Sequence, residues 1–412
     1  MRKFGMSLAT AVLLAWGGAA LAQGTVKIGA IYPLSGNAAS AGQSSKAAIE
    51  MAVDIVNQDL LDLGELAMAK GAGLPNMKGA KVEVVFADNQ GTPAAGQSQA
   101  LRLITEEKVA AIVGAYQSGI TLTASAVAER YGIPFLTPES VATNLTERGF
   151  KWFFRATPIT SDLAAAYIDC LTERRAAGKK IDSLAIVNEN TEYGSSIAET
   201  LRKAFGANGF NVTMEIPYSA NSSDVQPQVL QLKDKNPDLV IFVSYTSDSI
   251  LYAKAMRSLN YRPTMMLADN AGFNDPAFVE QVGNLVEGVI NRSAFAPGNP
   301  GTIPHRINEM FKARTGRDLD DPSARAMMGM LVMCDAINRA GSTEPAKIQA
   351  ALKATDLKQN QILTGYRGVK FDEKGQNILA FTLITQMHGG KYVPVWPASM
   401  ASAPVKDYVG WQ

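Results

Sequence analysis

Short β-rich runs alternate with helical patterns along almost the whole chain, and this alternation limits the possible fold more than any other feature. The β-rich runs lie at 26–31, 82–87, 110–113, 133–136, 184–187, 212–216, 239–243 and 265–267. Helical patterns follow the first three of them, near 45–56, 94–107 and 121–130. Strands that are apolar throughout and separated by helices are typical of parallel sheets covered on both faces. The sequence therefore predicts an α/β fold.

The number of strand–helix units calls for more than one sheet. The chain has 412 residues, of which 47% are apolar and 19% charged, so it can bury a sizeable core that is too large for one ordinary domain. We expect two doubly wound, mostly parallel lobes. The end differs, because 379–387, a turn at 388–390 and 392–396 form the pattern of an antiparallel hairpin. We interpret the glycine-containing stretch 60–79 as a surface excursion.

The first residues have the pattern of a secretion signal. Arg2 and Lys3 precede an apolar stretch at 8–16, and Ala20-Leu21-Ala22 places small residues where a signal peptidase cleaves. The apolar stretch is short for a membrane span, so a retained anchor is the less favoured alternative. Cleavage after Ala22 leaves Gln23 first, which is not a cysteine that could carry a lipid. We therefore expect an exported, periplasmic protein of 23–412 without a lipid anchor.

Composition excludes several classes of function. The 39 basic and 38 acidic residues nearly cancel, so the chain has no positive excess for nucleic acid. Two cysteines and two histidines cannot form a disulfide-dense scaffold, a four-thiolate zinc site or a three-histidine metal centre. Cys170 and Cys334 each lie in an apolar helical pattern, which favours two buried, unpaired thiols over a disulfide. We expect neither a metal nor a cofactor.

Sequence templates for catalysis are also missing. The chain contains no G-x-G-x-x-G, no Walker A sequence and no H-E-x-x-H. The stretch 96–100 lacks the second glycine of a nucleophile elbow. His305 at an expected helix start and His388 in an expected turn are interpreted as surface residues, and the Asp320-Asp321 pair as a solvated helix end. An enzyme, and a hydrolase in particular, is therefore the least favoured class.

In open α/β sheets, ligands bind beyond the carboxyl ends of the strands. The residues that follow the expected strands are polar, small or aromatic, with few titratable groups, and they lie at 33–36, 87–89, 114–119, 137–140, 188–193, 244–246 and 269–270. Such residues are typical of a binding site more than of a catalytic one.

Several ordered motifs resemble one protein family. They are VKIGAIYPLSG at 26–36, GIPFLTP at 132–138, LTERG at 145–149 before FRATP at 154–158, the pair Tyr193-Gly194, and FDEKG at 371–375. In this order the chain resembles the periplasmic substrate-binding proteins of ABC transporters for branched-chain amino acids, the Leu/Ile/Val-binding proteins. The resemblance extends over nearly the whole of 23–412.

The resemblance implies a two-lobe clamp of the type 1 periplasmic binding protein class, in which three crossovers form the hinge. Lobe I would comprise 23–157 and 291–371, and lobe II 158–290 and 372–412. The ligand would be a small molecule held between the lobes, and the partners would be the permease subunits of an ABC transporter in the inner membrane. A monomer is expected.

The resemblance also implies which residues of lobe I contact the ligand. Ser118, at an expected helix start, corresponds to a serine that binds the ligand carboxylate, and Tyr116 and Gln117 would line the side-chain pocket. The loop Glu139-Ser140-Val141 normally offers backbone amides and a hydroxyl group. Here Val141 replaces a frequent threonine, and Glu139 is a departure because its carboxylate would repel a ligand carboxylate.

Lobe II would supply Tyr193 as an aromatic contact, and Tyr245 and Asp269 as the group that binds the ligand ammonium. An aliphatic or aromatic amino acid is therefore the preferred ligand. An amide or urea-like solute and an aromatic carboxylate remain alternatives within the same class. A periplasmic sensor that reports to a receptor remains an alternative from another class.

Overall fold

The computed structural model describes residues 24–60 and 63–410, with the side chains of Gly283 and Asn284 left aside. The expected signal peptide, 1–22, lies outside the described residues. The described chain forms two α/β lobes, each built on a largely parallel sheet, as the alternating pattern predicted.

Lobe I contains a five-stranded parallel sheet in the order β2-β1-β3-β4-β5. Its strands are β1 (Thr25–Tyr32), β2 (Lys81–Asp88), β3 (Ala111–Gly114), β4 (Phe135–Thr137) and β5 (Phe153–Arg155). One face is covered by α2 (Pro93–Thr105) and α3 (Ser118–Tyr131), and the other by α1 (Ala39–Asn57), α10 (Asp321–Ala340) and α11 (Pro345–Lys353). Each face buries its own apolar cluster, because alternate strand residues point to opposite sides.

Lobe II contains a seven-stranded sheet in the order β14-β13-β10-β9-β8-β6-β7. Its strands are β6 (Leu184–Glu189), β7 (Val212–Tyr218), β8 (Leu239–Val243), β9 (Met265–Ala268), β10 (Ile290–Ser293), β13 (Leu383–His388) and β14 (Lys391–Trp396). The flanking helices are α4 (Thr160–Ala176) and α5 (Glu192–Ala207) on one face, and α6 (Gln226–Lys235), α7 (Thr246–Ser258) and α8 (Pro276–Val282) on the other. The antiparallel pair β13–β14 confirms the predicted hairpin.

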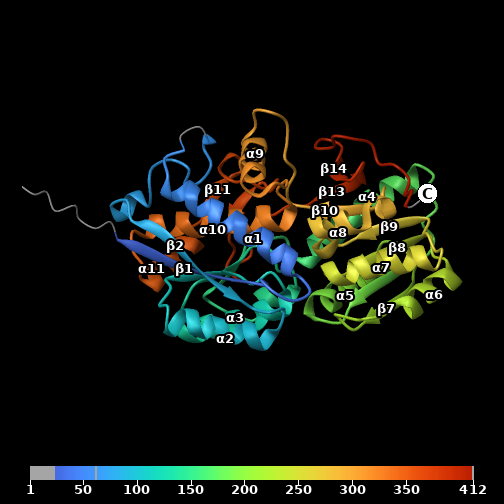
Figure 1. The fold of residues 1–412 in the computed structure, drawn as a ribbon, viewed down its shortest axis with the longest axis horizontal. Helices are drawn as coiled ribbons and strands as arrows, with labels where there is room; N and C mark the ends of the chain where they lie inside the picture. The colour runs from blue at the N-terminus through green and yellow to red at the C-terminus, as the bar shows by residue number, and fades with distance from the viewer. Residues whose placement is uncertain (1–23, 61–62, 411–412) are drawn as a thin grey trace, which may run out of the picture.

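Three crossovers join the lobes, which lie side by side in Figure 1. The chain leaves lobe I after β5, returns after β10 to α9 (Ile303–Thr315), and leaves again between β12 (Gly368–Lys370) and β13. β12 pairs with β11 (Asp356–Lys358) in a small antiparallel sheet.

Two expected lobe boundaries require correction. β10 pairs with β9 and β13, so 291–293 lies in the sheet of lobe II and not in lobe I. The side chain of Asn377 donates to the carbonyl groups of Ala156 and Gly368, so the third crossing follows 377 instead of 371. Residues 291–293 and Asn377 both lie next to crossovers, where motif resemblance carries little information about which strands pair.

The part of the stretch 60–79 that the structure describes, residue 60 and residues 63–79, is not a surface excursion. Leu63 and Leu74 are fully buried, and Leu66 is nearly so. The backbone N–H of Ala67 donates to the carbonyl oxygen of Gln361, which ties the segment to a distant part of lobe I. The packing partner lies some 290 residues farther along the chain, so the local sequence does not reveal that these apolar residues are packed.

Two further expectations concern the cysteines and the membrane. Cys170 in α4 and Cys334 in α10 are free and buried, as predicted. Among the helices of the described residues, none combines the length and the apolar character that crossing a bilayer requires.

Gly42 offers a test of the packing between α1 and the turn after β1. A Cβ atom at this position would lie 1.9 Å from the carbonyl oxygen of Pro33. We expect Gly42→Ala to cost about 2 kcal/mol of unfolding free energy, because backbone cannot move aside cheaply. The control is Gly206→Ala in α5, where nothing lies within 4 Å and alanine should stabilise the helix by roughly 0.5–1 kcal/mol. Equal melting temperatures of the two variants would contradict this packing.

Candidate functional site

A small chamber lies between the two lobes. Lobe I lines it with Tyr116, Ser118, Glu139 and Arg325, and lobe II with Tyr193, Tyr245, Asn270, Ala271 and Arg292. Its volume is about 20 Å³, which is close to the space that one water molecule needs. A ligand as large as an amino acid therefore enters only when the lobes stand farther apart than they do here.

The topology explains why these side chains meet. Tyr116 and Ser118 follow β3, Glu139 follows β4, Tyr193 follows β6, and Tyr245 follows β8. The carboxyl ends of parallel strands share one edge of each sheet, and the crossovers bring the two edges face to face. Among the predicted ligand residues, the five that line this one chamber are Tyr116, Ser118, Glu139, Tyr193 and Tyr245.

Three tyrosines form the aromatic wall of the chamber. The ring of Tyr245 lies 5.2 Å from that of Tyr193 and 6.2 Å from that of Tyr116, so Tyr116 of lobe I meets Tyr245 of lobe II across the cleft. The hydroxyl group of Tyr116 is buried and has no hydrogen-bond partner among the described residues. This wall can contact an apolar ligand group and still offer a polar atom.

Asp269 lies next to the chamber residues Arg292 and Tyr193, and both of its carboxylate oxygens accept hydrogen bonds from the protein. Arg292 donates to its carboxylate through Nε and Nη2, at 2.8 and 3.1 Å. Tyr167 donates to Oδ1 at 2.7 Å, and the single hydroxyl hydrogen of Tyr193 is shared between Oδ2, at 2.9 Å, and the backbone carbonyl oxygen of Asp269. A carboxylate accepts about four hydrogen bonds. In this arrangement the protein's own donors engage both carboxylate oxygens of Asp269, so its expected role as the ammonium ligand stays a prediction.

The environment of Asp269 keeps it ionised. Burial alone would raise the pKa of this carboxyl group, but the Arg292 guanidinium and the two tyrosine hydroxyls outweigh burial and lower the pKa. Arg292, in β10, and Asp269, directly after β9, thus form a buried ion pair in lobe II whose charges cancel.

A second buried ion pair joins the lobes near the hinge. Arg325 of α10 contacts Asp321 at 2.8 Å and donates to the side-chain oxygen of Asn270 at 3.2 Å. Asn270, from lobe II, donates to Asp321 at 2.7 Å. The interpretation of Asp320-Asp321 as a solvated helix end is therefore wrong for Asp321, which is only 4% exposed. The helix begins at the lobe interface and not at the surface.

Glu139 is the remaining carboxylate of the chamber. Its Oε1 accepts a hydrogen bond from Tyr32 at 2.9 Å, whereas its Oε2 is buried without a hydrogen-bond partner among the described residues. Arg325 donates to the backbone carbonyl oxygen of Glu139, not to its carboxylate. Burial is the main reason that the pKa of Glu139 is raised to about 8, although Arg325 and Tyr32 act to lower it.

Of the other residues that were predicted in lobe I, Ser118 lines the chamber, whereas Ser140 and Gln117 do not. Ser118 lines the chamber at the first turn of α3, and its Oγ accepts from the N–H of Ala142 at 3.4 Å. Ser140 is engaged with Thr121 and with the carbonyl of Tyr116, so it holds the loop against α3. Gln117 reaches toward Asn37, at 3.5 Å, rather than into the chamber.

Val141, the last of the predicted lobe I residues, is buried and does not line the chamber. Its carbonyl oxygen accepts from Thr160 at 2.9 Å, which fixes the first crossover. Ser140, Val141 and Gln117 are therefore not among the residues that line the chamber, and their expected ligand contacts stay predictions.

Polar contacts hold the rim of the cleft closed. Ser40 of α1 donates to Asp275 of lobe II at 2.7 Å. Ser247 of α7 donates to the carbonyl oxygen of Asn37 at 3.1 Å. These neutral or singly charged contacts are individually weak in competition with water, so they permit the lobes to separate.

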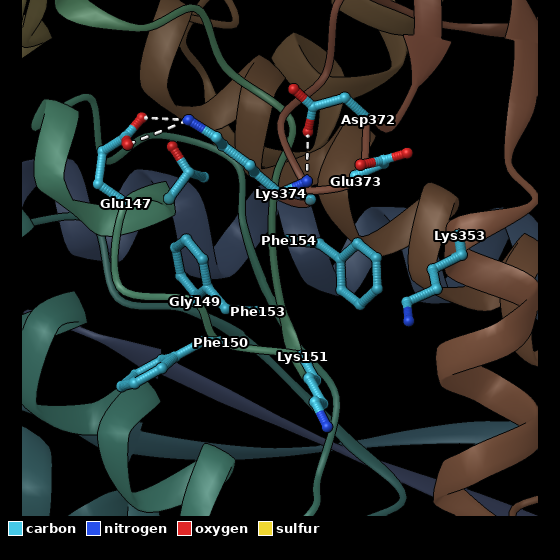
Figure 2. A pocket seen from close by; sticks show the side chains of 12 residues that line it. Glu147, Gly149, Phe150, Lys151, Phe153, Phe154, Lys353, Asp372, Glu373 and Lys374 are labelled. Carbon is cyan, nitrogen blue, oxygen red and sulfur yellow. Dashed lines mark hydrogen bonds and ion pairs between the residues drawn. The ribbon is translucent and has the colours of Figure 1, made fainter.

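A different hollow, of about 240 Å³, lies on lobe I beside the third crossover. Figure 2 shows Phe150, Phe153 and Phe154 at its base and the ion pair of Glu147 with Lys374 at its edge. Lobe II contributes none of its strands or helices to this hollow. It is therefore not the site at which a clamp would grip a ligand.

Sequence reasoning missed Arg292 and Arg325, and it placed Asn270 only among the residues that follow the expected strands. Arg325 lies in a helix whose residues are mostly apolar, whereas Arg292 lies between the polar residues Asn291 and Ser293, and both arginines are at most 4% exposed. A charged residue inside an apolar element is a usable signal, since such a residue is buried only with a partner. The signal reveals that a partner exists but not which residue it is.

Comparisons with known proteins agree with this architecture. The periplasmic binding protein family matches residues 25–391. The Leu/Ile/Val-binding protein homolog 7 of Brucella suis biovar 1 (strain 1330) is 30% identical over 421 residues, covering 98% of this chain and 99% of that protein.

Two solved structures share the fold. The leucine binding protein LivK from Thermotoga maritima MSB8 superposes with a TM-score of 0.75 at 23% identity, covering 89% of this chain and 97% of that chain. A solute binding protein of an ABC transporter from R. palustris, in complex with benzoate, has a TM-score of 0.75 at 17% identity, covering 94% and 98%.

The family match covers most of the chain, and the relative from Brucella is matched over nearly its full length. Two α/β lobes, three crossovers and a chamber lined by both lobes are the architecture of a solute-binding clamp. The chain therefore belongs to the periplasmic binding protein family, and within it resembles the Leu/Ile/Val-binding proteins of ABC transporters.

Proposed function

We propose that this protein captures a small solute, preferably an amino acid, between its lobes in the periplasm and delivers it to the permease of an ABC transporter. The observation that carries the proposal is the chamber, to which both lobes contribute side chains from the carboxyl ends of their strands. A ligand that contacts both lobes stabilises the closed arrangement over the open one. Such a difference is what a permease can recognise.

The amino end of α3 supports a carboxylate as one pole of the ligand. Ser118 is the first residue of the helix, where the helix dipole and free N–H groups favour an anion. Because its Oγ accepts from Ala142, the hydroxyl hydrogen stays available to donate. This geometry fits the role that the resemblance assigned to Ser118.

The tyrosine wall supports an apolar ligand side chain and also a second candidate. Tyr116, Tyr193 and Tyr245 can flank an aliphatic group or an aromatic ring. The relative from R. palustris was solved with benzoate. An aromatic carboxylate is therefore the second candidate, and it differs from an amino acid in lacking the ammonium.

Ligand-induced thermal stabilisation tests the binding function. Protein that has been unfolded and refolded is free of ligand carried through purification, and a ligand at 100 times its Kd adds about 2.7 kcal/mol of stability. We expect melting temperature to rise with one group of amino acids from a panel that also includes aromatic carboxylates and small amides. A rise with carboxylates alone would replace the amino acid by the second candidate, and no rise at all would contradict both.

Delivery requires a separate experiment, because a periplasmic sensor would bind ligand equally well. An ABC permease and its ATPase from the same organism can be reconstituted in vesicles together with this protein. We expect uptake of the bound solute to depend on this protein. Ligand binding without any uptake would favour the sensor.

A further inference from the structure

Glu139 leaves one buried polar atom without a partner in the chamber. The residue is 4% exposed, and its Oε1 is engaged by Tyr32 while its Oε2 has no hydrogen bond among the described residues. Buried polar atoms are nearly always satisfied, so an unsatisfied one in a binding chamber points to a ligand.

The charges around the chamber single out the same group. Arg292 is paired with Asp269, and Arg325 is paired with Asp321. Each pair is neutral. Among the acidic and basic side chains that line the chamber, Glu139 is therefore the one without a counter-ion at hydrogen-bonding distance among the described residues. A ligand that brings a positive charge would balance it.

We propose that Glu139, and not Asp269, accepts the ammonium group of the ligand, so that this protein selects solutes that carry a cationic nitrogen. The inference rests on the proposed amino-acid function and specifies it. Ser118 and Glu139 follow neighbouring strands of lobe I, β3 and β4, so one lobe offers a donor for the ligand carboxylate and an acceptor for its ammonium. Lobe II then closes with its tyrosines over the ligand side chain.

Ligand binding at Glu139 is expected to change the protonation of its carboxyl group. Glu139 is buried, faces Tyr32 of β1 and both Arg325 and Asp321 of α10, and has a pKa of about 8 in this arrangement. At pH 7 its carboxyl group is therefore largely protonated. An arriving ammonium group favours the carboxylate, so Glu139 loses its proton to the buffer while the ligand keeps its own charge. Binding should release up to one proton per ligand.

Matched ligand pairs test the proposal by calorimetry. L-leucine is compared with 4-methylpentanoate, and L-phenylalanine with 3-phenylpropanoate, since each pair differs only in the amine. We expect wild-type protein to bind the amino acid at least about 30-fold more tightly than its partner without the amine. Titrations in buffers of different ionisation enthalpy should show proton release at pH 7 with the amino acid only.

Variants assign the effect to the residue. Glu139→Gln should lose most of the preference for the amine and all of the proton release, and Glu139→Asp should retain part of both. Glu106→Gln, an exposed charge change at the end of α2, is the control and should behave as wild type. The proton release of wild type needs no variant, so the test holds even if a substitution at Glu139 impairs folding.

Each outcome has a defined meaning. Equal affinity within the pairs, or amino-acid binding without proton release, would overturn the role of Glu139 while leaving solute binding intact. Binding of the carboxylates alone would do the same. Absence of binding by every member of both pairs would overturn the amino-acid function itself, and the inference with it.

Discussion

Replacing Arg292 by methionine is expected to destabilise the protein by about 3–5 kcal/mol, because the substitution leaves the Asp269 carboxylate buried without its counter-ion. Both side chains of this pair are at most 5% exposed, so water cannot take the place of the guanidinium group. Tyr167 and Tyr193 would remain as donors, but neutral hydroxyl groups compensate a buried charge only in part. Urea unfolding followed by circular dichroism measures the loss.

Two comparisons make this expectation specific. In the double variant Arg292→Met with Asp269→Asn, no charge stays buried, and we expect stability to recover by at least about 1 kcal/mol. In the same lobe, Arg202 and Glu215 form an ion pair at 3.0 Å whose side chains are 50% and 38% exposed. Arg202→Met should therefore cost less than about 1 kcal/mol. If Arg292→Met lowered the unfolding free energy no more than Arg202→Met does, the buried ion pair would not contribute to stability as expected.

Between pH 4.5 and pH 8, the ligand-free protein is expected to lose stability relative to its Glu139→Gln variant, on the order of 4–5 kcal/mol. Burial is the main cause, and it raises the pKa of Glu139 from 4.5 to about 8. The folded state therefore binds this proton more tightly than the unfolded state does. The stabilisation is complete below the unfolded pKa and disappears as the pH rises through the folded pKa.

Unfolding of both proteins at several pH values between 4 and 9 measures the difference. Subtracting the variant is necessary because burial also raises the pKa of Asp248 and of Asp320, each to about 6. Those two carboxyl groups are present in both proteins, so their contributions cancel. A difference that does not change with pH would mean that Glu139 is solvated, and it would remove the basis for proton release on ligand binding.

The two results would connect stability with function. A carboxyl group that destabilises the ligand-free clamp above pH 8 is one that a cationic ligand can stabilise. Substitution by glutamine should then give a more stable protein that binds less well, which is a common trade at binding sites. Asp269 should show the opposite behaviour, since its partner is the protein's own Arg292.

The sequence by itself determined the repeated strand–helix units, the hairpin at the end and the edge at which Tyr116, Ser118, Glu139, Tyr193 and Tyr245 gather. These features follow from local periodicity and from the rule that parallel strands share their carboxyl edge. Both depend on neighbours along the chain, so they can be recognised from the order of residues alone.

Only the tertiary structure decided which carboxylate has no counter-ion within the protein. Asp269 and Glu139 each follow a buried strand, and nothing in their sequence neighbourhoods reveals that Arg292 occupies the first and that Arg325 turns to Asp321. The packing of 60–79 against lobe I was equally hidden. The partner of Asp269 lies 23 residues away and that of Ala67 on a distant part of lobe I, and even the pairing of Arg325 with Asp321 on one helix depends on the burial that folding creates.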